Sequence, residues 1–117
     1  MSANKKRILH LEDDRDIQRY ISVILSDVAE ITPANTLKEA RALVKSTPFD
    51  LVMTDFTLPD GSGSDFVIEL AKQHPSIPVI VFSVHEVSDT MVNVSKVFVK
   101  GRLNVQDLIS SVQTLCK

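Results

Sequence analysis

The chain has 117 residues, 44% of them hydrophobic and 24% charged, and its formal net charge is −2. This length and composition suit one globular domain over residues 1–117 and exclude a disordered chain, while the single Cys116 excludes an internal disulfide. The balanced charge argues against direct binding of nucleic acid or membrane, and neither a membrane-spanning run nor a secretory signal is recognisable, so we expect a cytoplasmic protein.

In the first half of the chain, short apolar runs alternate with stretches of helical periodicity. Residues 8–11 predict a buried strand, and a helix follows from Asp14. The apolar face of this helix is formed by Ile17, Tyr20, Ile21, Ile24 and Leu25. Residues 28–31 predict a weaker second strand, and the capping-box pattern from Thr36 to Glu39 opens a second helix. Residues 51–53 predict the third strand, which leads into a turn-rich stretch at 58–64.

The second half repeats this alternation with one interruption. A third helix ends at His74, before Pro75, and its apolar face is Phe66, Val67, Leu70 and Ala71. Residues 79–82 and 97–99 predict the last two strands, and Asn104 caps a final helix with the face Val105, Leu108, Val112 and Leu115. Residues 83–95 show no clear helical stripe and predict either a short helix or a loop. We therefore expect a doubly wound α/β fold with five parallel strands in the order 2-1-3-4-5.

Polar side chains follow four of these five strands. Glu12 and Asp13 follow the first, Asp55 the third, Ser83 the fourth and Lys100 the fifth. Ligands of such sheets bind beyond the carboxyl ends of the strands, where the winding reverses between strands one and three, so these residues should converge there. Each one alone is more often a turn residue, a helix cap or a solvated charge, but all five at one edge are much less often a coincidence.

The predicted cluster indicates a particular chemistry. Three carboxylates repel one another unless a cation lies among them, and oxygen ligands without His or Cys suit Mg²⁺ rather than zinc. A lysine and a hydroxyl at the same edge complement a phosphoryl group, and a carboxylate can itself accept one as an aspartyl phosphate. Asp55 is the central candidate for this role. Asp14, Asp16 and Asp60 are explained as ordinary helix-cap, first-turn and turn residues.

The segments 8–14, 50–55, 58–63, 77–83 and 97–100 together resemble the receiver domain of two-component response regulators, the CheY-like family, whose sheet topology flavodoxins share. The segment Leu58-Pro-Asp-Gly-Ser-Gly63 after Asp55, combined with the early acidic pair, carries most of this likeness. The resemblance covers essentially the full length of the chain, with its segments in the family's order.

The resemblance implies a role for each residue at the edge of the sheet. Asp55 would be the phosphoacceptor, and Mg²⁺ would be held by Asp13 directly, by Glu12 through water, by Asp55 and by the backbone carbonyl of Thr57. Three further residues would respond to the phosphoryl group: the switch hydroxyl Ser83, the aromatic switch Phe98 and the cation Lys100. The partners would be a sensor histidine kinase or phosphotransfer protein and an unknown downstream protein, with no turnover of a separate substrate.

Two departures from the family pattern stand close to this site. Gly101 follows Lys100 where the family has proline, which favours a trans peptide and a more loosely held lysine. The connection from Ser83 to Lys100 is shorter than usual, so we expect a shortened or remodelled fourth helix and doubt the usual mode of dimerisation. His85 and Thr57 would tune the lifetime of the phosphate. His10 is expected to be a packed, neutral core residue, and His74 to cap helix carbonyls.

Three alternatives compete with a phosphorylated receiver. A haloacid-dehalogenase-like phosphatase needs a second Asp where Thr57 stands, and its nucleophile follows the first strand. A flavin-binding module needs a Ser/Thr-rich loop where Glu12 and Asp13 stand. A degenerate receiver, acting as a phosphorylation-independent interaction module, is favoured by Gly101 and the short connection but opposed by the complete acidic set.

Overall fold

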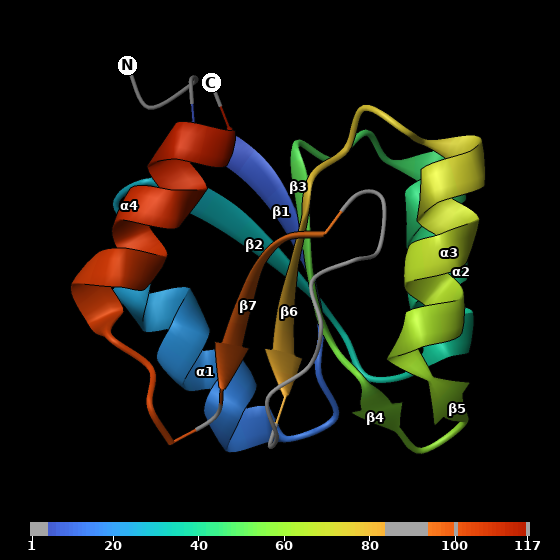
Figure 1. Ribbon diagram of the computed structural model, residues 1–117, viewed down its shortest axis with the longest axis horizontal. Coiled ribbons are helices and arrows are strands. Elements are labelled where there is room, and N and C mark those ends of the chain that lie inside the picture. Colours follow the sequence, from blue (N-terminus) through green and yellow to red (C-terminus); the bar gives the residue numbers. More distant parts are fainter. Residues whose placement is uncertain (1–4, 84–93, 100, 117) are drawn as a thin grey trace.

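The structure is a computed structural model that describes residues 5–83, 94–99 and 101–116. A parallel sheet runs through its centre (Figure 1), formed by β1 (Lys6–Leu11), β2 (Ala29–Ala34), β3 (Leu51–Asp55), β6 (Val79–Ser83) and β7 (Val94–Val99). The helices are α1 (Arg15–Ile24), α2 (Leu37–Ser46), α3 (Gly63–Gln73) and α4 (Val105–Leu115). A short antiparallel hairpin, β4 (Thr57–Leu58) and β5 (Gly61–Ser62), stands between β3 and α3.

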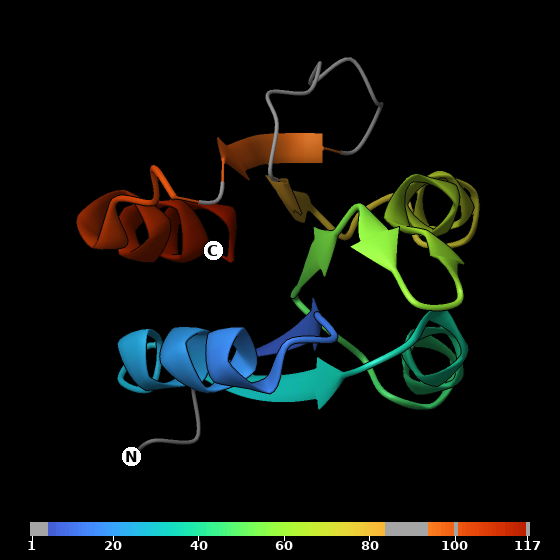
Figure 2. The ribbon, with the colours of Figure 1, turned by 90° about the horizontal axis from the view of Figure 1, so that it is seen from below.

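The order of the strands is β2-β1-β3-β6-β7, with every neighbouring pair parallel. This confirms the predicted order, because β6 and β7 are the fourth and fifth strands of the sheet. Figure 2 shows α1 and α4 on one face of the sheet and α2 and α3 on the other. The winding therefore reverses between β1 and β3, and the loop that follows β1 lies at that reversal.

Both faces of the sheet are covered by apolar side chains. All five residues of β3 and all five of β6 are buried, as expected for central parallel strands. Leu9, Val52 and Val81 pack with the residues of α2 and α3, whereas Ile8, Met53 and Ile80 pack with those of α1 and α4. Alternate residues of each strand thus serve two separate cores, and the sheet between them is a rigid support for its polar edge.

The helices begin at the residues that the capping patterns predict. Asp14 accepts hydrogen bonds from the backbone N–H groups of Asp16 (2.9 Å) and Ile17 (3.2 Å), which confirms its role as a cap. Thr36 accepts from Glu39 N at 3.2 Å, and the Glu39 carboxylate accepts in return from Asn35 N at 3.0 Å. The side chain of Asn104 caps α4 in the same way, by accepting from Asp107 N at 3.0 Å. None of the helices among the described residues is long and apolar enough to span a membrane.

The structure extends and corrects several predicted boundaries. β2 runs on through Pro33 to Ala34, and Val94, which the sequence pattern assigns to a short helix or loop, is the first residue of β7. The predicted strand at 97–99 begins three residues earlier, where the pairing of β6 with β7 has a register shift between Val79 and Ile80 that breaks the expected alternation. The predicted remodelling of the fourth helix, His85, Lys100 and the Lys100–Gly101 peptide lie on or at residues outside the described part of the chain.

The predictions for the first and second histidines agree with the structure. His10 is 1% exposed and its ring centroid lies 6.0 Å from that of Phe82, so it is packed in the core. His74 ends α3, where its backbone N–H donates to the carbonyl of Leu70.

Candidate metal centre at the carboxyl edge of the sheet

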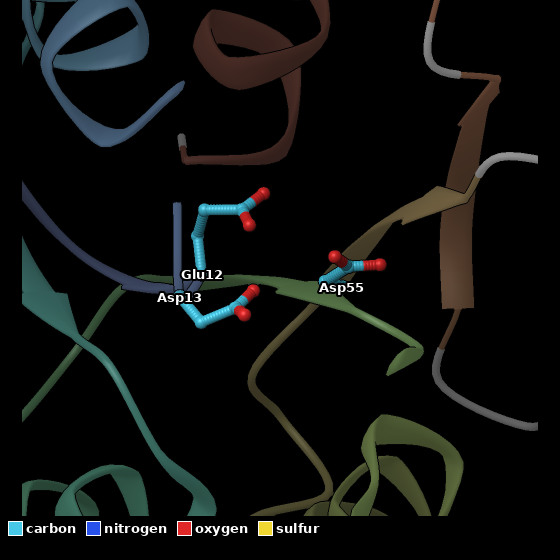
Figure 3. A group of neighbouring side chains, drawn as sticks. All are labelled: Glu12, Asp13 and Asp55. Carbon is cyan, nitrogen blue, oxygen red and sulfur yellow. The ribbon is translucent and has the colours of Figure 1, made fainter. Parts of the chain in front are cut away.

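Three carboxylates meet where β1 and β3 end. The two strands are paired in register, with Leu11 opposite Thr54, so the next residues along each strand, Glu12 and Asp55, come to the same edge. One carboxylate oxygen from each of Glu12, Asp13 and Asp55 lies within 4.8 Å of the other two. Figure 3 shows the three side chains entering the same space, two from the end of β1 and one from the end of β3.

The three acidic groups differ in their exposure to solvent. Glu12 is 1% exposed and Asp55 is 8% exposed, whereas Asp13 is exposed. Burying carboxylates is costly unless hydrogen bonds or a cation compensate for the lost hydration. An arrangement with two buried carboxylates and one facing water therefore offers an ion both protein oxygens and an open, hydrated side.

The backbone of Glu12 is firmly attached to its surroundings. Its N–H donates to the carbonyl of Ala34 at 2.9 Å, and its own carbonyl accepts from the side-chain amide of Gln18. The Glu12 carboxylate accepts from Asp14 N at 3.2 Å. These contacts fix the direction in which the acidic pair leaves β1.

The backbone after Asp55 is equally constrained. The Thr54 hydroxyl donates to the carbonyl of Asp55 at 2.9 Å, and Gly63 N donates to the carbonyl of Phe56 at 2.8 Å. A Cβ at Gly63 would lie 1.9 Å from the Asp55 carbonyl oxygen, so only glycine fits at this position. Gly61, with φ of +147°, is the other glycine of this loop.

The donor set fits Mg²⁺. The cluster contains only carboxylate oxygens, without His or Cys, and hard cations prefer such ligands. Magnesium keeps several of its waters and takes one or two carboxylates directly, which matches a cluster with one exposed member. Among the described residues, Glu12, Asp13 and Asp55 are therefore the side chains that could hold the ion.

Ser83 lies on the neighbouring strand. Asp55 pairs with Phe82 in the register of β3 with β6, so Ser83 stands one residue further toward the same edge, where it is 6% exposed. Ser83 and Asp55 therefore stand at the same edge of the sheet, on neighbouring strands. Thr57, whose backbone belongs to β4, follows Asp55 by two residues.

Phe98 lies on β7 opposite Phe82, which is itself paired with Asp55. It is 5% exposed and stacks on Phe82, with ring centroids 5.8 Å apart and an interplanar angle of 23°. Phe82 and Phe98 pack with the helices α1 and α4, whereas Val81 packs on the opposite face. Because successive residues of a strand alternate, Ser83 shares the face of Val81, whereas Phe82 and Phe98 share the opposite face.

Asp60 makes long-range contacts that the sequence pattern did not indicate. It lies in the turn of the β4–β5 hairpin, as predicted, but its carboxylate also accepts from Leu37 N at 2.9 Å and from Lys38 N at 3.2 Å. These hydrogen bonds lower the pKa of Asp60 below its ordinary value, with the bond from Leu37 as the largest cause. Its partners stand 22 and 23 residues earlier in the chain, so no local motif could reveal them.

Comparison with known proteins identifies the family. Residues 8–104 match the family model of the response regulator receiver domain. The chain is 34% identical over 94 residues to the response regulator protein PilR of Pseudomonas aeruginosa, covering 80% of this chain and 21% of PilR. It is also 34% identical over 87 residues to the sensor protein TorS of Escherichia coli, covering 73% of this chain and 10% of TorS. The chain therefore spans only a small part of these two relatives.

Solved structures show the same fold. The response regulator TrrA of Thermotoga maritima, crystallised with Mg²⁺-BeF, superposes with a TM-score of 0.85 at 27% identity, over 94% of this chain and 98% of TrrA. A CheY-like receiver domain of Methanospirillum hungatei gives a TM-score of 0.86 at 24% identity, over 95% of this chain and 93% of that one, a likeness of fold alone. With the family model, the related sequences and the sheet topology in agreement, the chain belongs to the response regulator receiver domain family of two-component systems.

Proposed function

We propose that this receiver domain accepts a phosphoryl group on Asp55 from a sensor histidine kinase or phosphotransfer protein, in a Mg²⁺-dependent reaction in the cytoplasm. The observation that carries the proposal is the cluster of Glu12, Asp13 and Asp55, whose carboxylate oxygens lie within 4.8 Å of one another at the winding reversal of the sheet. Family membership supports the same conclusion and leaves the phosphatase and flavin-binding alternatives without support.

The residues of the metal centre would have two roles in phosphoryl transfer, binding the ion and supplying the nucleophile. Asp13, Asp55, Glu12 and the backbone carbonyl of Thr57 would hold the ion, which when bound supplies positive charge that offsets both the carboxylates and the phosphoryl oxygens. An Asp55 oxygen forms the new bond to phosphorus while the phosphorus–nitrogen bond to the histidine of the donor breaks. Because Asp55 is fixed by its strand and by the backbone contacts after it, the chain contributes mainly a preoriented nucleophile.

Residues around the phosphorylated Asp55 would then respond to the phosphoryl group. Phosphorylation adds negative charge and strong acceptor oxygens at the strand ends, which draws the hydroxyl of Ser83 and the cation of Lys100 toward it. The group changes the conformation only through contacts that differ between the two states. Since Ser83 follows Phe82, and Phe82 stacks on Phe98, a shift of the end of β6 would reach the aromatic switch through this pair of rings and alter a partner-binding surface.

Incubation with a small phosphodonor and Mg²⁺, followed by intact-mass measurement, tests the proposal. The expected result is an adduct of about 80 Da that is absent after chelation of Mg²⁺. Asp55→Asn should abolish it, whereas Asp65→Asn, which changes an exposed aspartate of the first turn of α3, should leave it intact.

Two outcomes would contradict this function. A folded protein that gives no adduct at any Mg²⁺ concentration would favour the alternative, an interaction module that works without phosphorylation. An adduct that persists in Asp55→Asn would place the phosphoacceptor elsewhere.

A further inference from the structure

The start of α2 is bound by a residue from outside the helix. The first N–H groups of a helix have no partner within it, and α2 distributes them between two acceptors. Its own cap, Thr36, takes the N–H of Glu39, while the carboxylate of Asp60 takes those of Leu37 and Lys38. Asp60 is therefore the link between α2 and the β4–β5 hairpin.

The hairpin is pressed against both α2 and the backbone of the phosphoacceptor. A Cβ at Gly61 would lie 2.8 Å from a methyl carbon of Leu37, and one at Gly63 would overlap the Asp55 carbonyl oxygen. Leu37 and Leu58, one from the helix and one from the hairpin, are buried in the same apolar cluster. The segment that carries Thr57 thus has little space in which to shift while Asp60 holds its tip.

The same end of α2 is also attached to the other half of the metal centre. The side-chain amide of Gln18 donates to the side-chain oxygen of Asn35 at 2.6 Å and to the backbone carbonyl of Glu12. Glu12 N donates to the carbonyl of Ala34, directly before Asn35. Residues 34–38 therefore connect the segment that bears Glu12 to the segment that follows Asp55.

We propose that Asp60 is a positioning residue of the metal centre, which holds the hairpin and the backbone of Thr57 in register with the segment of Glu12 by way of the start of α2. The inference rests on the proposed function, since the Thr57 carbonyl is a proposed ligand of Mg²⁺. Asp60 itself touches neither the ion nor the phosphoryl group. Its removal releases the tip of the hairpin and weakens the binding of Mg²⁺ without removing a ligand.

The test compares two variants, each of which removes a side chain that accepts hydrogen bonds from N–H groups of the first turn of α2. Asp60→Ala deletes the hydrogen bonds between the hairpin and α2, and Thr36→Ala deletes a cap whose hydrogen bond is made within α2. Titration calorimetry with Mg²⁺, well below the unfolding transition, should show about tenfold weaker binding for Asp60→Ala, the size usual for residues that orient metal ligands. Thr36→Ala should lower the urea midpoint but keep the Mg²⁺ affinity of the native chain.

Phosphorylation rates add a second readout. With a small phosphodonor, Asp60→Ala should raise the Mg²⁺ concentration for half-maximal rate, while the rate at saturating Mg²⁺ stays near that of the native chain. Asp60→Asn keeps one acceptor oxygen, so its Mg²⁺ concentration for half-maximal rate should lie between those of the native chain and Asp60→Ala. It replaces Asp60→Ala in the test if that variant does not fold.

The possible outcomes separate this inference from the proposed function. Native Mg²⁺ affinity in both Asp60 variants, or equal loss in Thr36→Ala, would overturn the positioning role and leave the phosphoacceptor role standing. A native chain that binds no Mg²⁺ would overturn the proposed function, and this inference with it.

Discussion

Two glycines, Gly63 and Gly101, are required for different physical reasons. Gly63 lies against the main chain of Asp55, where a Cβ would stand 1.9 Å from the carbonyl oxygen. Gly101 has open space around it but a φ of +88°, a conformation that side chains with a Cβ rarely adopt. Gly63 is required because there is no room for a Cβ, and Gly101 because its backbone has a positive φ.

Alanine at each position should separate these demands. Gly63→Ala should lower the free energy of unfolding by more than about 3 kcal/mol, because the carbonyl it meets cannot move without moving Asp55. Gly101→Ala should cost about 1 kcal/mol, the strain of a positive φ alone. Urea unfolding of both variants measures the difference. Equal losses would show that the close approach at Gly63 is relieved by backbone movement.

The connection between the hairpin and α2 makes stability depend on pH. The N–H groups of the first turn of α2, that of Leu37 above all, lower the pKa of Asp60 from its ordinary 3.8. A carboxyl whose pKa is lower in the folded state stabilises that state above its ordinary pKa, and the contribution is lost as the pH falls through the lowered value.

Asp60→Asn, which cannot titrate, exposes this contribution. Its urea midpoint should lie below that of the native chain at neutral pH, and the gap should close as the pH falls below 3.8. Thr36→Ala is the control, because a hydroxyl does not titrate and its gap should stay constant over the same range. A gap for Asp60→Asn that does not change with pH would contradict the charged interaction.

At the scale of elements, the sequence pattern predicted what local rules determine. The helix caps at Asp14, Thr36 and Asn104, the order of the strands and the acidic cluster followed from periodicity and from the alternation of strand and helix. The β4–β5 hairpin was missed because strands of two residues carry no periodicity. The contacts of Asp60 were missed because they join segments far apart in the chain.

The register between β6 and β7 illustrates the same limit. Which residues share a face of a sheet depends on strand register, and the register of β7 is set by its irregular pairing with β6. A shift of one residue moves every side chain to the other face, so a sequence alone cannot decide which residue of β7 lies beside Ser83.

At the scale of the whole molecule, we expect the acidic cluster to lower the stability of the folded chain when no cation is present. Three carboxylates within 4.8 Å of one another repel in the folded chain and separate in the unfolded one. An ion that binds only the folded state therefore stabilises the entire domain.

Mg²⁺ at a concentration about tenfold above its dissociation constant should raise the free energy of unfolding of the native chain, measured with urea, by about 1.4 kcal/mol. Asp13→Asn should be more stable than the native chain in the absence of Mg²⁺, because it removes one of the repelling charges, and should gain less when the ion is added. Na⁺ at equal ionic strength controls for screening. An equal gain in both proteins would show that Asp13 takes no part in binding.

Pro33 limits how copies of this domain can associate. In a parallel strand the N–H and C=O of one residue point to the same side, and Ala34, whose carbonyl accepts from Glu12, faces β1. The backbone nitrogen and carbonyl of Pro33 therefore point away from β1, toward the open edge of β2, the outer strand. Because proline has no N–H, that edge lacks a hydrogen-bond donor at this position. A strand from another molecule would meet a missing donor there, so this side of the domain resists fibril-like stacking and domain swapping through added strands.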